Sequence, residues 1–420
     1  MPGRVALRLC PDILSRLSKG VRIICVTGTN GKTTTCGLLS HGLSKSGLSY
    51  FVNNSGANMI TGVTTAFITH STLFGKCRCQ YAVLECDENS LPRISACIDA
   101  DILVVTNVFR DQLDRYGEVT HTLAKIKEGV DNMPSCHLIL NADCPLTYSL
   151  SVLCANDCST FGINAHDAVF VASDSPYCPF CHNLLRYSRV VYSQLGDYSC
   201  MHCDYRRPNP TVMADSIIDL GEGGSSFFLH TGYDSRYATS SLGGIYNVYN
   251  YIAAYLVLQM IGIDTADALA DYSGAFGRME RFDCNGNSVL MLLVKNPVGL
   301  ANCVRYVAGL KSEFDICFAL NDNDADGRDV SWIWDASFVP LSRKSCRVYS
   351  MGTRCYDMAL RLKYDSIDSA VIEGEDYRRL IDTVRDNNRD FVVLATYTAM
   401  MNMRKVFVRE FGGDAFWHER

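Results

Sequence analysis

The chain has 420 residues, with 39 Lys and Arg against 45 Asp and Glu, a net charge of −6 at neutral pH and 48% hydrophobic residues. This length admits two or three domains that each bury a core, and the acidic balance argues against a partner held through nucleic-acid phosphates, because that affinity comes from Lys and Arg. No apolar run approaches the roughly 18 residues of a transmembrane helix, and residues 1–20 lack the apolar core of a secretory signal.

A phosphate-binding loop is the first feature in chain order. The apolar run Arg22–Thr27 predicts a buried parallel strand, a glycine turn follows at Gly28–Gly31, and Lys32 opens a helix. Such a helix start favours anions, because backbone N–H groups and the helix dipole point there. We expect Lys32 to reach the terminal phosphates of a nucleotide and Thr33 to hold Mg²⁺. The expected ATP-binding residues of this loop are Gly28, Thr29, Asn30, Gly31, Lys32, Thr33 and Thr34.

Residues 21–145 alternate apolar strands with helical stretches. This order predicts a mostly parallel, doubly wound sheet that binds its ligands at the carboxyl ends of the strands. Glu85 ends one strand at the same sheet edge as the loop, so we expect it to hold Mg²⁺, with Asp87 and Glu88 as alternatives. The predicted strands are Arg22–Thr27, Ser49–Asn53, Tyr81–Glu85, Ile102–Thr106 and His137–Asn141.

Two polar segments follow other strand ends in this region. One comprises Thr106–Asn107 and Asp111–Glu118, and the other is Asn141–Asp143. From the residues alone, the first is a charged loop that caps a helix, and the second is a cap between a strand and a helix.

Twenty cysteines are many for this length. Most stand singly in apolar context, where a free thiol packs as a small hydrophobe, and this fits a reducing cytosol better than a disulfide framework. Four of them have the spacing C-x2-C-x18-C-x2-C of a zinc ribbon. Four thiolates close a tetrahedral site, so we expect a structural zinc, with a redox-active pair as the alternative and His182 and His202 as bystanders. The predicted zinc ligands are Cys178, Cys181, Cys200 and Cys203, in an insertion at about residues 175–207.

The second half of the chain begins with short predicted strands at residues 213–240. A helix is predicted from about Asn247 to Ile261, where Asn247 is an N-cap or a ligand, and a second α/β pattern starts near residue 287. We therefore predict an ATP-binding domain over residues 1–285 and a C-terminal, Rossmann-like α/β domain over residues 286–420. The strands predicted in the latter are Ser288–Val294, Asp315–Leu320, Ser345–Ser350 and Asp390–Leu394.

Three motifs resemble the Mur-type amide ligases. The loop G-T-N-G-K-T is similar to the ATP loop of these enzymes and of folylpolyglutamate synthases, and Gly243–Asn250 and Phe276–Glu280 resemble two further segments of the Mur family. The resemblance implies a Mur-type central P-loop ATPase domain in which Asn250 contacts the adenine and Arg278 contacts the ATP phosphates. Gln112 stands where the family carries a histidine that helps to bind a second metal.

The C-terminal part resembles a narrower family. Leu293–Gly299 and Leu320–Asp335, together with the ribbon inserted in the ATPase domain, are similar to the MurT family, the ligase-like subunits of lipid II isoglutaminyl synthases. The similarity covers nearly the whole chain.

Asp329 lies in the most acidic segment of this region. From the residues alone, a Ca²⁺ loop and a solvated acidic turn are alternatives, but Trp332 and Trp334 indicate burial or an interface. The resemblance implies that Asp329 completes the catalytic triad of a partner glutaminase, whose own chain supplies cysteine and histidine. Asp335 and then Asp326 are the alternatives for this role.

The resemblance implies an ATP-dependent carbon–nitrogen ligase. It would phosphorylate the α-carboxylate of D-glutamate in the stem peptide of lipid II, and ammonia from a GatD-like glutamine amidotransferase would then give D-isoglutamine. Lys32 and Mg²⁺ would stabilise the charge of the phosphoryl group.

The expected cofactors are ATP, Mg²⁺ and a structural Zn²⁺. The expected assembly is a cytoplasmic heterodimer with its GatD-like partner that acts at the inner face of the membrane, although no segment reads as a membrane-binding amphipathic helix. The alternatives are a stand-alone Mur or folylpolyglutamate-type ligase, which needs a pocket for an incoming amino acid, and a nucleotide-binding scaffold without catalysis.

Overall fold

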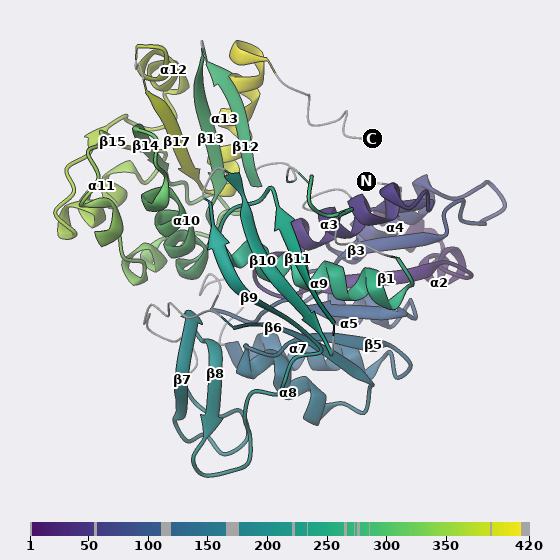
Figure 1. Ribbon diagram of the computed structural model, residues 1–420. Coiled ribbons are helices and arrows are strands. Elements are labelled where there is room, and N and C mark those ends of the chain that lie inside the picture. The colour runs from purple at the N-terminus through teal and green to yellow at the C-terminus, as the bar shows by residue number, and fades with distance from the viewer. Residues whose placement is uncertain are drawn as a thin grey trace. The chain divides into compact units, whose positions relative to one another are not determined.

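The computed structural model of the chain describes residues 2–53, 57–110, 119–164, 176–220, 223–232, 234–263, 267–272, 274, 278–284, 286–386 and 389–412 (Figure 1). Of Asp219 and Arg278 it describes the backbone alone. The chain forms two compact units, which are described separately. The first is drawn from residues 1–109 and 118–273, and the second from residues 110–117 and 274–420.

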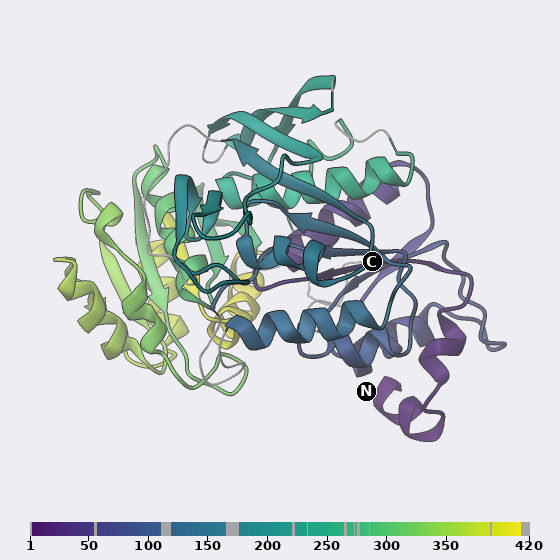
Figure 2. The same ribbon diagram turned by 90° about the horizontal axis from the view of Figure 1, so that it is seen from below.

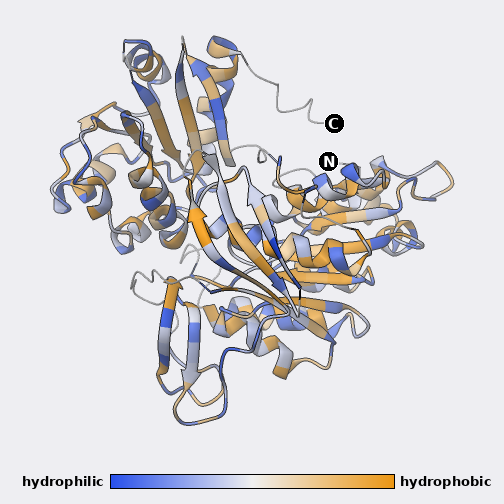
Figure 3. Cartoon of the chain, viewed as in Figure 1, coloured by the Kyte–Doolittle hydropathy of each residue, from blue (hydrophilic) through white to orange (hydrophobic). Residues whose placement is uncertain are grey.

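A nine-stranded sheet in the order β11-β10-β9-β6-β5-β4-β1-β3-β2 forms the centre of the first unit. The strands from β9 to β2 are parallel, and β10 and β11 extend the sheet in antiparallel fashion. The central strands consist mostly of apolar residues (Figure 3), and almost all of these residues are buried, as expected where helices cover both sides of a parallel sheet. The strands are β1 (Arg22–Thr27), β2 (Tyr50–Val52), β3 (Tyr81–Glu85), β4 (Ile102–Val105), β5 (His137–Asn141), β6 (Cys158–Asn164), β9 (Val212–Asp219), β10 (Ser225–Thr231) and β11 (Asp234–Ser240).

Helices lie on both faces of this sheet, with α7 on one side and α9 on the other (Figure 2). Helix α9 packs closely on α3, because Gly42 has no side chain and a Cβ there would lie 2.4 Å from Leu258 Cδ1. The described helices of this unit are α1 (Pro2–Leu9), α2 (Ile13–Leu17), α3 (Lys32–Lys45), α4 (Ile60–Thr69), α5 (Leu91–Ser95), α7 (Val119–Asp131), α8 (Pro145–Leu153) and α9 (Ile245–Met260).

A separate antiparallel hairpin is inserted between β6 and β9. It consists of β7 (Leu185–Tyr192) and β8 (Leu195–Cys200). The predicted zinc ligands lie just before β7 and around the end of β8, so the hairpin carries both cysteine pairs.

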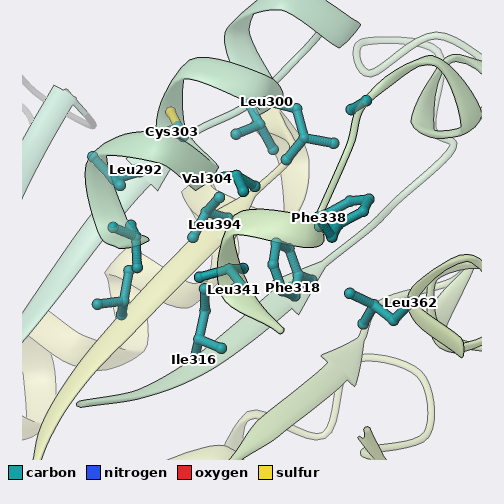
Figure 4. Packing of buried hydrophobic residues seen from close by; sticks show 14 of the residues in the cluster. Leu292, Leu300, Cys303, Val304, Ile316, Phe318, Phe338, Leu341, Leu362 and Leu394 are labelled. Carbon is teal, nitrogen blue, oxygen red and sulfur yellow. The ribbon is translucent and has the colours of Figure 1, made fainter. Parts of the chain in front are cut away.

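The second unit is built on a six-stranded sheet in the order β12-β13-β17-β14-β15-β16. All of its strands are parallel except β12, which pairs with β13 in antiparallel fashion. Apolar side chains of the strands and of α10 form one of its cores (Figure 4). Its elements are β12 (Arg278–Cys284), β13 (Asn287–Leu293), α10 (Pro297–Gly309), β14 (Phe314–Ala319), η2 (Ser331–Asp335), η3 (Val339–Leu341), β15 (Val348–Met351), α11 (Cys355–Tyr364), β16 (Ala370–Val371), α12 (Tyr377–Arg385), β17 (Asp390–Ala395) and α13 (Tyr397–Phe411).

The predicted fold class is confirmed. Strand β12 pairs with β13 in the second sheet, and the two compact units divide between residues 273 and 274. The structure adds the short strand β16, and residues 2–17 form two helices that the sequence pattern did not reveal. No helix of the described ranges combines the length and the apolar composition that crossing a bilayer requires.

Candidate active site and metal centre

The predicted phosphate loop follows β1 at the carboxyl edge of the first sheet. Gly28 and Gly31 have φ of +118° and +88°, in the left-handed region that favours glycine. At Gly28 a Cβ would also lie 2.4 Å from Thr106 Oγ1 and 2.7 Å from the Asn107 carbonyl oxygen. Glycine is therefore required here both by the backbone and by the close approach of the segment that follows β4.

Asn107 holds the loop through its backbone and its side chain. Its carbonyl oxygen accepts a hydrogen bond from Thr29 N at 2.9 Å, and its Oδ1 accepts one from Asn30 N at 2.9 Å. Thr106 Oγ1 donates to the Asn30 carbonyl at 2.7 Å. Two loop amides thus bind protein atoms, so the donors expected to face phosphate are the N–H groups of the first turn of α3, which precede the intrahelical hydrogen bonds.

Lys32 is buried and its ammonium group is enclosed by oxygens. Nζ donates to the carbonyl oxygens of Gly28 and Thr29 and lies 2.8 Å from Glu88 Oε1. Burial alone would lower the pKa of Lys32, but the nearby carboxylates, Glu88 above all, outweigh it and raise the pKa. The side chain is therefore a fixed cation at the position where the sequence predicted a phosphate contact.

The three carboxylates after β3 have different surroundings. Glu85 Oε2 accepts a hydrogen bond from Thr33 Oγ1 at 2.8 Å. The backbone N–H and carbonyl of Glu85 both bind the side-chain amide of Asn53, which fixes the end of the strand. Asp87 accepts from two backbone N–H groups at the start of α5, while Glu88 pairs with Lys32. The adjacent hydroxyl of Thr33 and carboxylate of Glu85 are hard oxygen ligands and fit Mg²⁺.

Asn250 reaches the phosphate loop from the first turns of α9. It is 5% exposed, its Nδ2 donates to Asn247 Oδ1 at 3.2 Å, and a Cβ on Gly31 would lie 2.2 Å from its Oδ1. The side chain of Asn247 also donates a hydrogen bond to the Gly243 carbonyl oxygen at 2.7 Å, just before the start of α9. The structure therefore brings Asn250 against the loop.

Other predicted site residues lie elsewhere or outside the described residues. Gln112, with the rest of residues 111–118, and residues 276–277 are outside, as is the side chain of Arg278. Arg278 itself is the first residue of β12 in the second unit.

Asp143 is a structural residue. Its carboxylate binds Arg207 Nε at 2.5 Å, the Tyr249 hydroxyl at 2.5 Å and Ile163 N at 2.7 Å. Burial raises the pKa of Asp143, although Arg207 and Tyr249 act in the opposite direction. Its carbonyl accepts from Gly196 N at the turn of the inserted hairpin. The network ties that hairpin to the sheet and to α9.

The four predicted zinc ligands converge. The sulfur atoms of Cys178 and Cys203 are 3.6 Å apart, those of Cys181 and Cys200 are 3.4 Å apart, and all four lie within 4.8 Å of one another. Metal–sulfur bonds of about 2.3 Å in a tetrahedral site would place sulfurs about 3.8 Å apart. The cluster thus has the dimensions of a site that could hold a metal ion.

The four thiols have different surroundings. Hydrogen bonds from Asn183 lower the pKa of the Cys181 thiol to about 6, whereas burial raises the pKa of the Cys178 thiol. His182 and His202 are exposed and are not members of the cluster. Four sulfur ligands leave no open coordination position, so the geometry suits a structural ion.

The three candidate aspartates of the acidic segment after β14 have different surroundings. Asp326 is buried and binds the backbone N–H of Thr398 at 2.7 Å as well as its hydroxyl, which anchors the segment to α13. Asp335 pairs with Arg110. Asp329 is partly exposed and accepts from Ser331 N and Oγ at 2.8 and 2.9 Å, at the start of η2. A partly exposed carboxylate on a turn with this local support suits a surface role better than the buried Asp326.

Sequence reasoning singled out Asn107 and Glu88 but did not predict that they bind the phosphate loop and Lys32, and it assigned no site role to Asn53. Asn107 and Asn53 both follow strand ends, and Glu88 belongs to a run of carboxylates at the same sheet edge. Position after a strand was the signal that could have found them, since such residues meet at one edge.

Comparison with known proteins places this fold and site in a class. Residues 26–258 match the family model of the Mur ligase middle domain. The solved structure of a pseudomurein peptide ligase type C from Methanothermus fervidus shares the fold, with a TM-score of 0.72 and 21% identity over 95% of this chain and 80% of that one. The chain is a Mur-type, ATP-dependent ligase, as the sequence predicted.

The narrower family follows from the C-terminal part and from curated relatives. Residues 293–400 match the model described as MurT ligase C-terminal. The chain is 34% identical to the MurT subunit of lipid II isoglutaminyl synthase (glutamine-hydrolyzing) from Streptococcus pneumoniae, covering 97% of this chain and 91% of that protein. The chain is also 34% identical to the MurT subunit from Staphylococcus aureus, covering 98% of this chain and 93% of that protein. The chain belongs to the MurT family, and the predicted resemblance is confirmed.

Proposed function

We propose that this chain is the synthetase subunit of a two-chain enzyme that amidates the α-carboxylate of D-glutamate in the stem peptide of lipid II. The observation that carries the proposal is the similarity to curated MurT subunits of lipid II isoglutaminyl synthase along nearly the whole chain. The phosphate loop, with its buried Lys32 and the adjacent Thr33 and Glu85, supports an ATP-dependent first step.

In that first step the γ-phosphate of ATP passes to the glutamate carboxylate, and ADP leaves. The cation of Lys32 and the N–H groups of the first turn of α3 stabilise the negative charge of the transferring group. Thr33 and Glu85 would hold Mg²⁺, which supplies further positive charge at the phosphates. Asn250 would contact the adenine and Arg278 the phosphates of ATP.

In the second step ammonia attacks the acyl carbon, and phosphate leaves as the amide forms. We propose that a GatD-like glutaminase subunit supplies this ammonia and that Asp329 orients the catalytic histidine of that partner. The partly exposed position of Asp329 supports this assignment, since the carboxylate must be reachable by another chain. The burial of Asp326 counts against that alternative.

The cysteine cluster is proposed to hold a structural Zn²⁺ rather than to take part in the reaction. The assembly is proposed to work in the cytoplasm at the inner face of the membrane, where its lipid-linked substrate is accessible.

The test is co-purification with a GatD-like glutamine amidotransferase, followed by amidation of lipid II with ATP and either glutamine or ammonium as the nitrogen source. We expect Asp329→Ala to lose glutamine-dependent amidation and to retain the ammonium-dependent reaction. Asp335→Ala is the matched control and should retain both. Unchanged glutamine hydrolysis in the Asp329→Ala complex would refute the triad assignment, and amidation by the chain alone with glutamine would refute the need for a partner. ATP binding without turnover in the complete mixture would favour a scaffold.

A further inference from the structure

A rigid hairpin after α4 presents two large apolar side chains to solvent. Ser71 and Cys77 form an antiparallel bridge, and the backbone of Thr72 is hydrogen-bonded to Lys76 and Gly75 at 2.8 and 2.9 Å. The two residues at the tip are Leu73 and Phe74, with 103% and 98% of their surface exposed. Figure 1 shows this hairpin projecting beyond α4. Loops of monomeric proteins rarely hold two large apolar side chains fully in water without an interaction that uses them.

Helix α1 adds an apolar and basic face on α4, the helix that leads into this hairpin. Gly3 is buried on α4, where a Cβ would lie 2.1 Å from the Thr61 carbonyl oxygen, so the helix is fixed with one face inward. Its outer face exposes Val5 and Leu9, at 60% and 80%. Residues four apart share a helix face, and the flanking Arg4 and Arg8 form a second exposed pair beside the apolar one.

Helix α2 joins the two elements. It packs on α4. The Leu17 side chain also lies against the hairpin, since a Cβ built on Gly75 would be 3.7 Å from Leu17 Cδ2. We call the outer surface of α1, α2 and this hairpin the N-terminal basic face. Within the first unit the hairpin and the end of α2 lie where β3 and β1 begin, whereas the phosphate loop follows the other end of β1, about 20 Å away for a six-residue strand.

The charge of this face is opposite to that of the whole chain. Residues 2–20 and 70–78 hold six Lys and Arg and a single carboxylate, Asp12, in a chain with a net charge of −6. Asp12 is paired with Arg16 at 2.7 Å. The remaining exposed cations are Arg4, Arg8, Lys19, Lys76 and Arg78. Exposed apolar side chains ringed by Lys and Arg match the surface of an anionic bilayer, which takes up apolar side chains and attracts cations.

We propose that the N-terminal basic face docks the chain on an anionic phospholipid membrane, with Leu73 and Phe74 inserted among the lipids. This inference rests on the proposed function, because that function gives the chain a lipid-linked substrate. Docking explains how an enzyme in which no described helix can span a membrane meets that substrate. The separation of Leu73 and Phe74 from the phosphate loop leaves the ATP site open while the hairpin is inserted.

The test is sedimentation of the full chain, alone and with its partner subunit, with vesicles of phosphatidylglycerol and phosphatidylcholine or of phosphatidylcholine alone. We expect binding to the anionic vesicles only, weakened by added salt. The double variant Leu73→Ser/Phe74→Ser should bind at least about tenfold more weakly, since each side chain loses its transfer out of water. Arg4→Ala/Arg8→Ala should bind roughly 30-fold more weakly, at about fivefold per basic residue.

Matched controls lie far from the face in sequence. Val152→Ser removes an apolar side chain that is 63% exposed on α8, and Lys363→Ala/Lys405→Ala removes two exposed cations of the second unit. These variants should bind vesicles as the unaltered chain does. The variant Phe74→Trp should show a blue-shifted emission with anionic vesicles if residue 74 enters the lipid.

Three results would overturn the inference: equal binding to neutral vesicles, unchanged binding by Leu73→Ser/Phe74→Ser, or loss of the partner subunit from that variant, which would make the face a protein interface. Amidation of a lipid-free stem-peptide substrate separates the two proposals. Failure of that assay with intact vesicle binding counts against the proposed function alone. Intact amidation without vesicle binding counts against the membrane face alone.

Discussion

The buried ion pair between Lys32 and Glu88 gives the sharpest test of the site as the structure has it. The two side chains are only 8% and 7% exposed and lie 2.8 Å apart. Removing one charge of a buried pair costs about 3–5 kcal/mol, because the other charge is left without its partner. For Glu88→Gln we expect the lower part of this range, about 3 kcal/mol, since the amide still accepts a hydrogen bond and Glu85 remains near. A unit of this size would lose about 6–12 °C in melting temperature.

The control is a surface pair of the same chemistry. Lys125 and Glu128 are 2.7 Å apart but 34% and 54% exposed, so Glu128→Gln should cost at most about 0.5 kcal/mol. Urea unfolding with and without Mg·ATP measures both variants. Because ATP phosphates would supply negative charge to Lys32, the deficit of Glu88→Gln should shrink when nucleotide is bound. Equal, small losses in the two variants, or a deficit that grows with ATP, would refute the role of Glu88 as the resting counterion of Lys32.

Three further outcomes follow from the geometry. Cys178→Ser should lose the bound metal and melt at a lower temperature, measured by metal content and calorimetry; retained zinc would contradict a site built from four cysteines. Gly31→Ala should weaken ATP binding at least about tenfold by calorimetry, from about 1–2 kcal/mol of left-handed backbone strain plus a clash with α9. Gly47→Ala is the control for this variant, because Gly47 has a φ of +70° but no atom within 4 Å of its would-be Cβ. It introduces the backbone strain without the clash and should leave ATP affinity unchanged. Asp143→Asn should lower the free energy of unfolding, measured in urea, by about 3–5 kcal/mol, because the buried Arg207 loses its carboxylate partner. A loss below about 1 kcal/mol would refute this structural role of Asp143.

Local pattern was enough to predict much of the first unit. The strands Arg22–Thr27, Tyr81–Glu85 and His137–Asn141 begin and end as the apolar runs predicted, because a parallel strand buried on both faces needs apolar residues throughout. The phosphate loop and the four convergent cysteines were also predictable, since both depend on spacing within a short segment. Such features are encoded locally.

What the sequence did not reveal depends on contacts between distant segments. The amides of Thr29 and Asn30 bind Asn107 only because β4 lies beside β1 in the sheet. Strand β12 follows the first domain in sequence, yet its hydrogen bonds go to β13. No periodicity within either strand carries this information.

The N-terminal basic face was missed for a different reason. Its apolar residues are few in each segment, so neither α1 nor the hairpin with Leu73 and Phe74 shows a long amphipathic pattern. The face exists because the fixed packing of α1 and α2 on α4 gathers residues from two segments that are some fifty positions apart.

The same kind of assembly governs the nucleotide loop. Asn107 binds it from the strand side and Asn250 meets Gly31 from α9, so two segments far from the loop in sequence hold its shape. Tyr249, one residue before Asn250, donates its hydroxyl to Asp143, whose carbonyl in turn binds the inserted hairpin. The shape of the phosphate loop is therefore a property of the whole first unit, and the hairpin that carries the cysteine cluster is joined through Asp143 to the helix that presents Asn250.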